Sequence, residues 1–151
     1  MKNTFLLLCA GLILSFSAQA QSKKKSTTAK VTVPESVSES FKGTYASVEK
    51  NKWNRTYTGN YVAVFTTPDS LSQEVEYNSN GVMVKTKTIY TPTTIPAVVG
   101  TAIEAKYPAA TIVEAVKMDI PGVKPYYKVS LTTAENAKRN LLISEEGAIA
   151  Q

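Results

Sequence analysis

Two carboxylate pairs have the spacing that acid–base or metal chemistry needs. Glu35 and Glu39 lie four residues apart, which places both on one face of a helix, and Glu145 and Glu146 precede Gly147. Paired carboxylates serve in glycoside hydrolysis and in calcium binding. However, Glu35 also suits a first helical turn, where negative charge complements the helix dipole, and the second pair lacks the spaced ligands of a calcium loop. We therefore expect no catalytic residue and no metal site.

The chain has no histidine, and its one cysteine lies within the first twenty residues. This composition excludes Ser-His-Asp and Cys-His catalysis and the usual zinc and copper sites. We expect no cofactor and no enzymatic activity. The alternative is a carboxylate-dependent, glycan-acting enzyme, which would need a deep pocket lined by several of Glu35, Glu39, Glu114 and Asp119.

A run of aromatic and basic residues is the first candidate binding surface. Trp53, Arg55 and Tyr57 alternate along the chain and would share one face of a strand. Aromatic side chains with arginine are typical of protein-binding hot spots. The competing interpretation is that Trp53 and Tyr57 fill a helix–sheet core, with Arg55 at its edge.

Surplus apolar residues give a second candidate surface. Val62 and Val64 lie on the strand face opposite to Tyr61, yet Lys128 and Ser130, which follow 66 residues later, are polar. If that face meets water, the two valines indicate a contact site. The candidate binding residues are therefore Trp53, Arg55, Tyr57, Val62, Val64 and Lys128.

The elements that position these residues occur twice. A shift of 62 residues aligns Pro34 with Pro96, Val37 with Val99, Phe41 with Ile103 and Tyr45 with Tyr107. Apolar residues every four positions after a proline predict a helix in each copy. A shift of 66 residues aligns strands 60–67 with 126–133 and segment 75–82 with 141–148. The offset changes at 120–125, where Pro and Gly predict a longer hairpin loop in the second copy.

The dipeptide Asn80-Gly81 predicts a hairpin with a two-residue type I′ turn. The resulting register places Ser79 opposite Val82, Tyr77 opposite Val84, Glu76 opposite Lys85, Val75 opposite Thr86, and Glu74 opposite Lys87. The equivalent dipeptide in the second copy is Glu146-Gly147, so the final strand, 148–151, must be short.

The first thirty residues predict export. Residues 1–20 combine Lys2, an apolar core and an Ala18-Gln19-Ala20 cleavage pattern, as in a cleaved signal peptide, and 21–31 form a flexible basic leader. Removing the five lysines before Val31 from 17 basic residues leaves 12, equal to the 12 acidic residues. A neutral body gives no indication of nucleic acid binding, and no later segment is apolar enough to span a membrane.

We therefore predict an α+β fold made of two tandem repeats, 32–91 and 92–151. Each repeat is one helix packed on an antiparallel sheet of about four strands. A module of about 60 residues is marginally stable alone, so the repeats should share a core or a continuous sheet.

The order of these segments resembles the PepSY-like family, which is grouped with the beta-lactamase-inhibitor-protein-like fold. The carrying segments are 33–45 with Trp53, 60–67, 74–84, 95–108, 126–133 and 140–150. The resemblance implies an α+β fold, a periplasmic or secreted location and no established enzymatic activity. The family name alludes to protein inhibitors.

The leading hypothesis is a non-enzymatic exported binding module, inhibitor-like, that contacts another envelope or secreted protein or a peptide. A structural envelope protein without a defined ligand is a further alternative. A flat or concave sheet face with exposed aromatic residues or valines would favour binding. The partner and the oligomeric state stay open.

Overall fold

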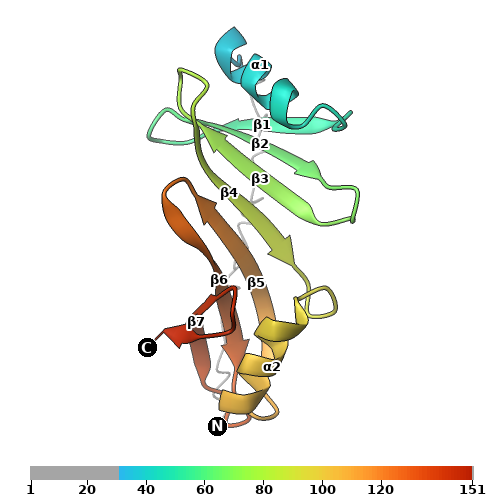
Figure 1. Ribbon diagram of the computed structural model, residues 1–151, viewed down its shortest axis with the longest axis vertical. Helices are drawn as coiled ribbons and strands as arrows, with labels where there is room; N and C mark the ends of the chain where they lie inside the picture. The colour runs from blue at the N-terminus through green and yellow to red at the C-terminus, as the bar shows by residue number, and fades with distance from the viewer. Residues whose placement is uncertain (1–30, 151) are drawn as a thin grey trace, which may run out of the picture.

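Two helices and eight strands make up the computed structural model, which describes residues 31–150. In chain order they are α1 (Glu35–Thr44), β1 (Asn51–Arg55), β2 (Tyr61–Thr66), β3 (Ser72–Tyr77), β4 (Met83–Tyr90), α2 (Ala97–Lys106), β5 (Thr111–Ile120), β6 (Val123–Thr132), β7 (Lys138–Ser144) and β8 (Ile149–Ala150). The strands form one antiparallel sheet in sequential order, with the helices at opposite ends of the long axis (Figure 1). The predicted α+β class and continuous sheet are confirmed. The predicted signal peptide and Gln151 lie outside the described residues, as does the leader except for Val31.

Each helix begins directly after a proline. Pro34 and Pro96 precede the first helical residues, where the missing N–H costs no hydrogen bond. Both helices have ten residues, a length that is marginal without tertiary packing. Burial of one apolar stripe stabilises each of them, because Phe41 of α1 is 5% exposed and Ile103 of α2 is 2% exposed.

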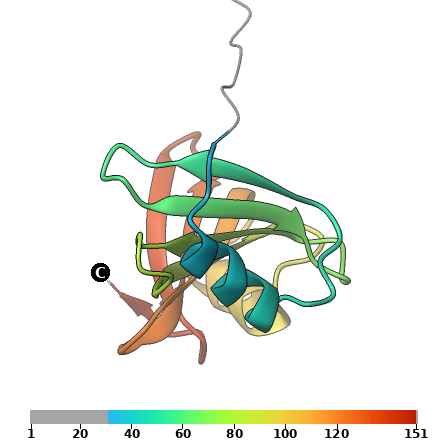
Figure 2. The same cartoon turned by 90° about the horizontal axis from the view of Figure 1, so that it is seen from above.

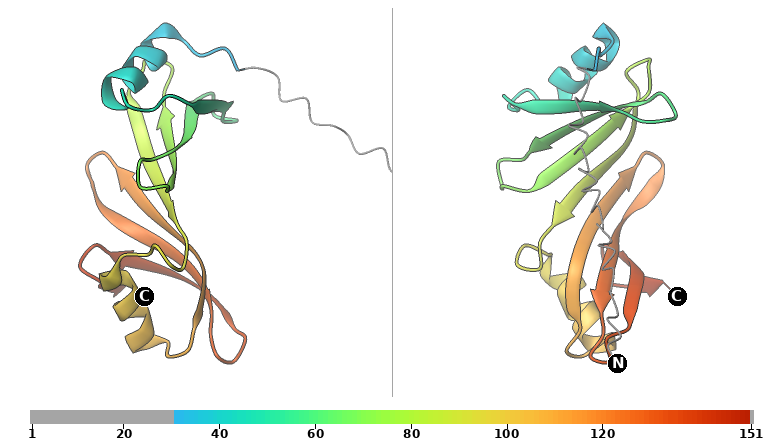
Figure 3. Two further views of the ribbon diagram at one scale, coloured as in Figure 1. Left: turned by 90° about the vertical axis from the view of Figure 1, so that its right-hand side faces the viewer. Right: turned by 180° about the vertical axis from the view of Figure 1, so that it is seen from behind.

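Both helices cover the same face of the sheet. Val75 of β3 lies opposite Thr86, and Tyr90, which shares the face of Thr86, lies opposite Ala115 of β5. Val75 packs under α1 and Ala115 under α2, so the strand register places the two helices on one side. The views from above and from the side show this arrangement (Figures 2 and 3). The opposite face carries no helix in the part of the chain that the structure describes.

The protein has two hydrophobic clusters under one sheet. The first cluster lies between α1 and strands β2 and β3, and the second lies between α2 and strands β5–β7. Tyr90 extends from β4 into the second cluster, where its ring lies 6.0 Å from that of Tyr127. Of the two expected ways of joining the halves, the continuous sheet is therefore the one observed.

The predicted two-residue turn at Asn80-Gly81 is wrong. The β3–β4 connection is a three-residue loop closed by Asn78 N–H, which donates to Val82 C=O (3.0 Å). The Asn78 side-chain oxygen accepts from the N–H groups of Asn80 and Val82 at 2.9 and 3.0 Å. Gly81 has φ +80°, as in the three-residue loop that ends in a left-handed residue. The side chain of Asn78 stabilises this loop over the shorter turn.

The longer loop shifts part of the predicted register. Glu74 opposite Lys87, Val75 opposite Thr86 and Glu76 opposite Lys85 are confirmed. A bulge follows, because the extra loop residue must be absorbed, and Tyr77 lies opposite Met83 instead of Val84. Similarly, Ser79 does not face Val82.

The predicted long loop at 120–125 is also wrong. Strands β5 and β6 have ten residues each, and Ile120 pairs with Val123 across a two-residue turn. Pro121 followed by Gly122 with φ +81° is the pattern of a type II turn. The additional residues of the second half therefore lengthen β5 and β6 and do not form a long loop. The β-branched residues on either side of the turn favour this extension.

Tyr77 carries a buried hydroxyl group, and this burial affects both its pKa and the stability of the fold. It is 1% exposed, and its hydroxyl makes no hydrogen bond of good geometry within residues 31–150, although the Thr44 side chain is near enough to lower its pKa slightly. Burial, with a smaller contribution from Tyr45 and a partial offset from Thr44, raises the pKa of Tyr77 to about 12 from 10.0. An unpaired buried hydroxyl costs about 1–3 kcal/mol.

We expect Tyr77→Phe to raise the free energy of unfolding by about 1 kcal/mol at neutral pH. Between pH 10 and 12 the unfolded tyrosine ionises while the buried one does not, so the natural protein loses up to about 2–3 kcal/mol as the pH rises. Because the phenylalanine variant lacks this loss, the gap between the two widens above pH 10. Urea unfolding at pH 7, 10 and 11 measures both effects, and a parallel pH dependence would contradict the assignment.

Candidate functional site

The face of the sheet opposite α1 and α2, here called the open face, carries a ladder of ion pairs. Glu76 contacts Lys85 at 2.8 Å, and Glu74 contacts Lys87 at 3.2 Å. Burial alone would raise the pKa of the Glu76 carboxyl. A hydrogen bond from Asn60 (2.7 Å) and the two lysine charges outweigh burial and lower that pKa below its ordinary value. Glu76 is therefore charged at neutral pH, and its charge is paired within the ladder.

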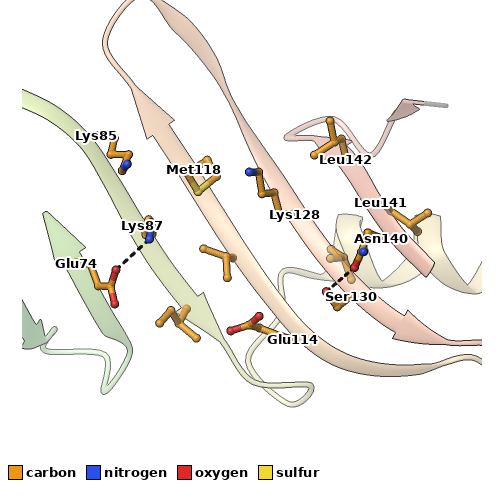
Figure 4. Close-up of a pocket in the computed structure, with 13 residues that line it drawn as sticks. Glu74, Lys85, Lys87, Glu114, Met118, Lys128, Ser130, Asn140, Leu141 and Leu142 are labelled. Carbon is orange, nitrogen blue, oxygen red and sulfur yellow. Dashed lines mark hydrogen bonds and ion pairs between the residues drawn. The ribbon is translucent and has the colours of Figure 1, made fainter. Parts of the chain in front are cut away.

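A groove of about 780 Å³ lies beside this ladder, in the middle of the open face. Side chains from five strands line it (Figure 4): Glu74, Lys85, Lys87, Ile89, Glu114, Val116, Met118, Lys128, Ser130, Asn140 and Leu142, with Val129 and Leu141 beneath. Neither α1 nor α2 covers it. The groove is accessible because the two helices occupy the other face.

The strand register builds an apolar floor in this groove. Ile89 of β4 lies opposite Val116 of β5, Val116 opposite Lys128 of β6, and Lys128 opposite Leu142 of β7. Leu142 is 47% exposed. Glu114 lies beside this row of side chains, two residues before Val116 on β5. The groove therefore combines apolar side chains with one exposed cation, Lys128, and one exposed anion, Glu114.

A smaller hollow of about 300 Å³ adjoins the groove along the ion-pair ladder. Asn54 and Val62 line its outer side, and Glu74, Lys85 and Lys87 line both cavities. The two cavities together extend across the open face from β1 to β7.

The structure separates the predicted aromatic surface. Trp53 and Arg55 point to the helix-covered face, where the Trp53 ring packs edge-on against Phe41 at 5.4 Å and the Arg55 guanidinium lies 5.4 Å from the Tyr61 ring centroid. Strand β1 ends at Arg55, so Tyr57 lies in the following turn, fully exposed. The expectation that the three share a strand face is wrong for Tyr57. The core interpretation fits Trp53.

The predicted open-face residues do lie on the open face. Val62 borders the smaller hollow, and Lys128 borders the groove. Val64 is half-buried on the same face and lines neither cavity. Sequence reasoning missed Ile89, Val116, Met118 and Leu142, and it named Glu114 only as an acid of the alternative enzyme pocket. The alternation of Glu114, Val116 and Met118 was the available signal, because three such residues share one face of a strand.

The acidic residues that an enzyme would need are spread over the molecule. Only Glu114 of the four named acids lines the groove. Glu35 and Glu39 are exposed on α1, and Asp119 lies opposite Thr86 on the helix-covered face. Within residues 31–150 no group of three or more His, Cys, Asp or Glu side chains is placed to hold a metal ion.

None of the helices in the part of the chain that the structure describes is long and apolar enough to span a membrane.

No family model matches the chain, and no curated protein matches its sequence. A BLIP-like protein from Bacteroides fragilis NCTC 9343 is 21% identical, with a TM-score of 0.70 over 82% of this chain and 87% of that chain. A DUF2874 family protein from Bacteroides ovatus ATCC 8483 is 20% identical, with a TM-score of 0.69 over 80% and 86%. A protein from Bacteroides eggerthii DSM 20697, provisionally described as periplasmic, is 19% identical, with a TM-score of 0.67 over 80% and 88%. At this identity the likeness shows the fold alone, which is the expected BLIP-like α+β fold.

Proposed function

We propose that the protein is a non-enzymatic exported binding module whose open face contacts another exported protein or a peptide. The groove carries this proposal. It is a broad, uncovered groove of about 780 Å³ whose floor carries the apolar side chains of Ile89, Val116 and Leu142, with the cation of Lys128 between the last two. Exposed apolar side chains next to charged ones are typical of a protein-binding surface.

The charges of the groove support binding with specificity. Glu74 and Lys87 neutralise each other, but Lys128 and Glu114 are exposed and belong to none of the ion pairs within residues 31–150. A partner can satisfy both by placing an anion near Lys128 and a cation near Glu114. Such charge complementarity contributes to partner choice and to the association rate.

The placement of carboxylates favours binding over glycan hydrolysis. A glycosidase positions two carboxyl groups about 5–10 Å apart on either side of one bond. Glu114 lines the groove without Glu35, Glu39 or Asp119, and Glu74 is engaged by Lys87. We therefore propose that the protein has no catalytic activity. In its more specific form, the proposal is that the protein is inhibitor-like.

Export and family membership are part of the proposal. Export rests on the signal-like sequence of residues 1–20 and on the periplasmic description of the similar Bacteroides eggerthii protein. Membership of the PepSY-like family rests on the order of the sequence segments. Both agree with a module that acts in the periplasm or outside the cell.

A tandem repeat explains why the two halves use matching contacts. A Cβ on Gly81 would meet Ser36, the second residue of α1, and a Cβ on Gly147 would meet Val98, the second residue of α2. These residues are related by the shifts of 66 and 62 positions found in the sequence. We infer that one helix-and-four-strand unit was duplicated and that the groove lies where the copies join.

Site-specific cross-linking in the native bacterium tests the proposed function. A photoreactive phenylalanine derivative replaces Ser130 in the groove or Thr101 on the exposed side of α2. We expect a defined protein or peptide adduct at Ser130 and none at Thr101. Adding Lys128→Glu with Leu142→Ser should reduce the adduct at least tenfold, because both the cation and the apolar anchor are lost.

The matched control carries Lys50→Glu with Val82→Ser, two exposed positions outside the groove. It should leave the Ser130 adduct unchanged. Equal loss in both variants, or adducts at Ser130 and Thr101 alike, would refute the open face as the binding surface. Hydrolysis of an envelope glycan that Glu114→Gln abolishes would favour the enzyme instead.

A further inference from the structure

The outer edge of β7 is largely unpaired. Strand β7 has seven residues and meets β8 through two residue pairs. Ser144 N–H donates to Ala148 C=O at 2.9 Å, so the backbone of Ser144 faces outward. Because backbone direction alternates in an antiparallel strand, Leu142, Asn140 and Lys138 face outward too. Within residues 31–150 the backbone groups of Lys138 and Asn140 have no strand partner.

Strand β3 shows what a completed edge looks like in the same molecule. Strand β4 runs along it for its full length, from Ile89 opposite Ser72 to Met83 opposite Tyr77. Within residues 31–150, the corresponding position beside β7 is filled only at Leu142 and Ile143. An extended segment in line with β8 would complete the pairing, which is the geometry of strand addition.

The side chains of this edge indicate the charge of such a segment. Lys138 and Arg139 are exposed and belong to none of the ion pairs in the described part of the chain. The Arg139 guanidinium donates to the neighbouring carbonyl of Lys138, at 3.4 Å, and its charge also lowers the pKa of the exposed Glu135 carboxyl, after the larger effects of hydrogen bonds from Thr133 and the Glu135 backbone. Neighbouring strands β3 and β4 match opposite charges across the ladder, as in Glu74–Lys87. A strand that matches β7 in the same way carries acidic residues.

The same two cations disfavour a second copy of this chain on this edge. Charged residues on edge strands are a common protection against self-association. Pairing β7 with another β7 would crowd four like charges, whereas an acidic segment would neutralise them.

We propose that the edge of β7 from Lys138 to Leu141 binds an extended acidic segment of another protein by strand addition. Backbone hydrogen bonds to Lys138 and Asn140 provide the register, and carboxylates contact Lys138 and Arg139. This site lies on the outer edge of the sheet, next to the groove, with which it shares Asn140 and Leu141.

Peptide titration followed by nuclear magnetic resonance tests this inference. The probe is a capped eight-residue peptide with two adjacent glutamates among threonines and valines. We expect chemical-shift changes and slower hydrogen exchange at the amides of Lys138 and Asn140. The same peptide with two lysines, or with N-methylated amides on one edge, should bind at least tenfold more weakly.

Two variants separate this edge from the other exposed edge. Lys138→Glu with Arg139→Glu should weaken the acidic peptide at least tenfold and strengthen the lysine peptide. Lys52→Glu on β1 should leave both affinities unchanged. No binding at millimolar peptide, equal binding of the two peptides, or shifts confined to β1 or to the groove residues of β3–β6 would overturn the proposal. A dimer in light scattering with protected β7 amides would identify a second copy as the occupant and would also overturn it.

Discussion

Replacing Phe41 with alanine is expected to lower the free energy of unfolding by about 3–5 kcal/mol. Phe41 is 5% exposed, and its ring lies 5.3 Å from that of Tyr45 and 5.4 Å from those of Trp53 and Phe65. The truncation leaves a cavity where α1 meets β1 and β2. The rigid sheet cannot fill this cavity, so both the burial and the aromatic contacts are lost.

Urea unfolding followed by circular dichroism and by the fluorescence of Trp53, the one tryptophan, measures this loss. Phe41→Leu should cost under about 1.5 kcal/mol because most of the volume is kept. Val98→Ala, at a residue that is 43% exposed, should change stability by under about 0.5 kcal/mol. A loss below about 1 kcal/mol for Phe41→Ala would mean that α1 contributes little to the fold.

The same unfolding experiment tests whether the two hydrophobic clusters contribute independently to stability. Ile103→Ala removes the corresponding side chain under α2 and should cost about 2–5 kcal/mol. Because Phe41 and Ile103 belong to different clusters, the double variant should lose the sum within about 0.5 kcal/mol. A large interaction energy would show that the continuous sheet transmits packing changes between the halves.

Local signals in the sequence are sufficient to predict the helices. Pro34 fixes the start of α1, and Val37 and Phe41 form the stripe that the sheet buries, so neighbouring residues carry the whole prediction. The turn at Asn80-Gly81 is harder to predict, because the same dipeptide occurs in two-residue and three-residue loops. The Asn78 side chain and the contact with α1 decide between them. The contact with α1 joins Gly81 to Ser36, which lie far apart in the sequence.

The groove shows a different limit. Alternation alone is enough to assign Val62 and Lys128 to the open face. The pairing of Ile89 with Val116 depends on how β4 meets β5 after the whole of α2 has intervened. The alternation of Val116 with Glu114 indicates only that they share a strand face, and it does not place Ile89 beside them. The binding surface is therefore a product of the strand register between the halves, and the sequence predicts only its separate pieces.

Replacing Gly81 with alanine is expected to lower the free energy of unfolding by about 3 kcal/mol, the sum of a conformational and a steric cost. Gly81 has φ +80°, a conformation that costs a residue with a Cβ about 1–2 kcal/mol. The new Cβ would also lie 2.5 Å from the Ser36 carbonyl oxygen and 2.7 Å from Ser40 Oγ. The turn or α1 must therefore move, at a further cost of about 1–3 kcal/mol.

Gly122→Ala separates the two causes. Gly122 has φ +81°, but a Cβ at this position would meet no atom within 4 Å beyond its chain neighbours, so this variant should lose only the conformational part, about 1–2 kcal/mol. The difference between the two variants then measures the contact of the β3–β4 loop with α1. Urea unfolding provides both values. Equal losses would mean that α1 yields freely, and the loop would then not fix the helix on the sheet.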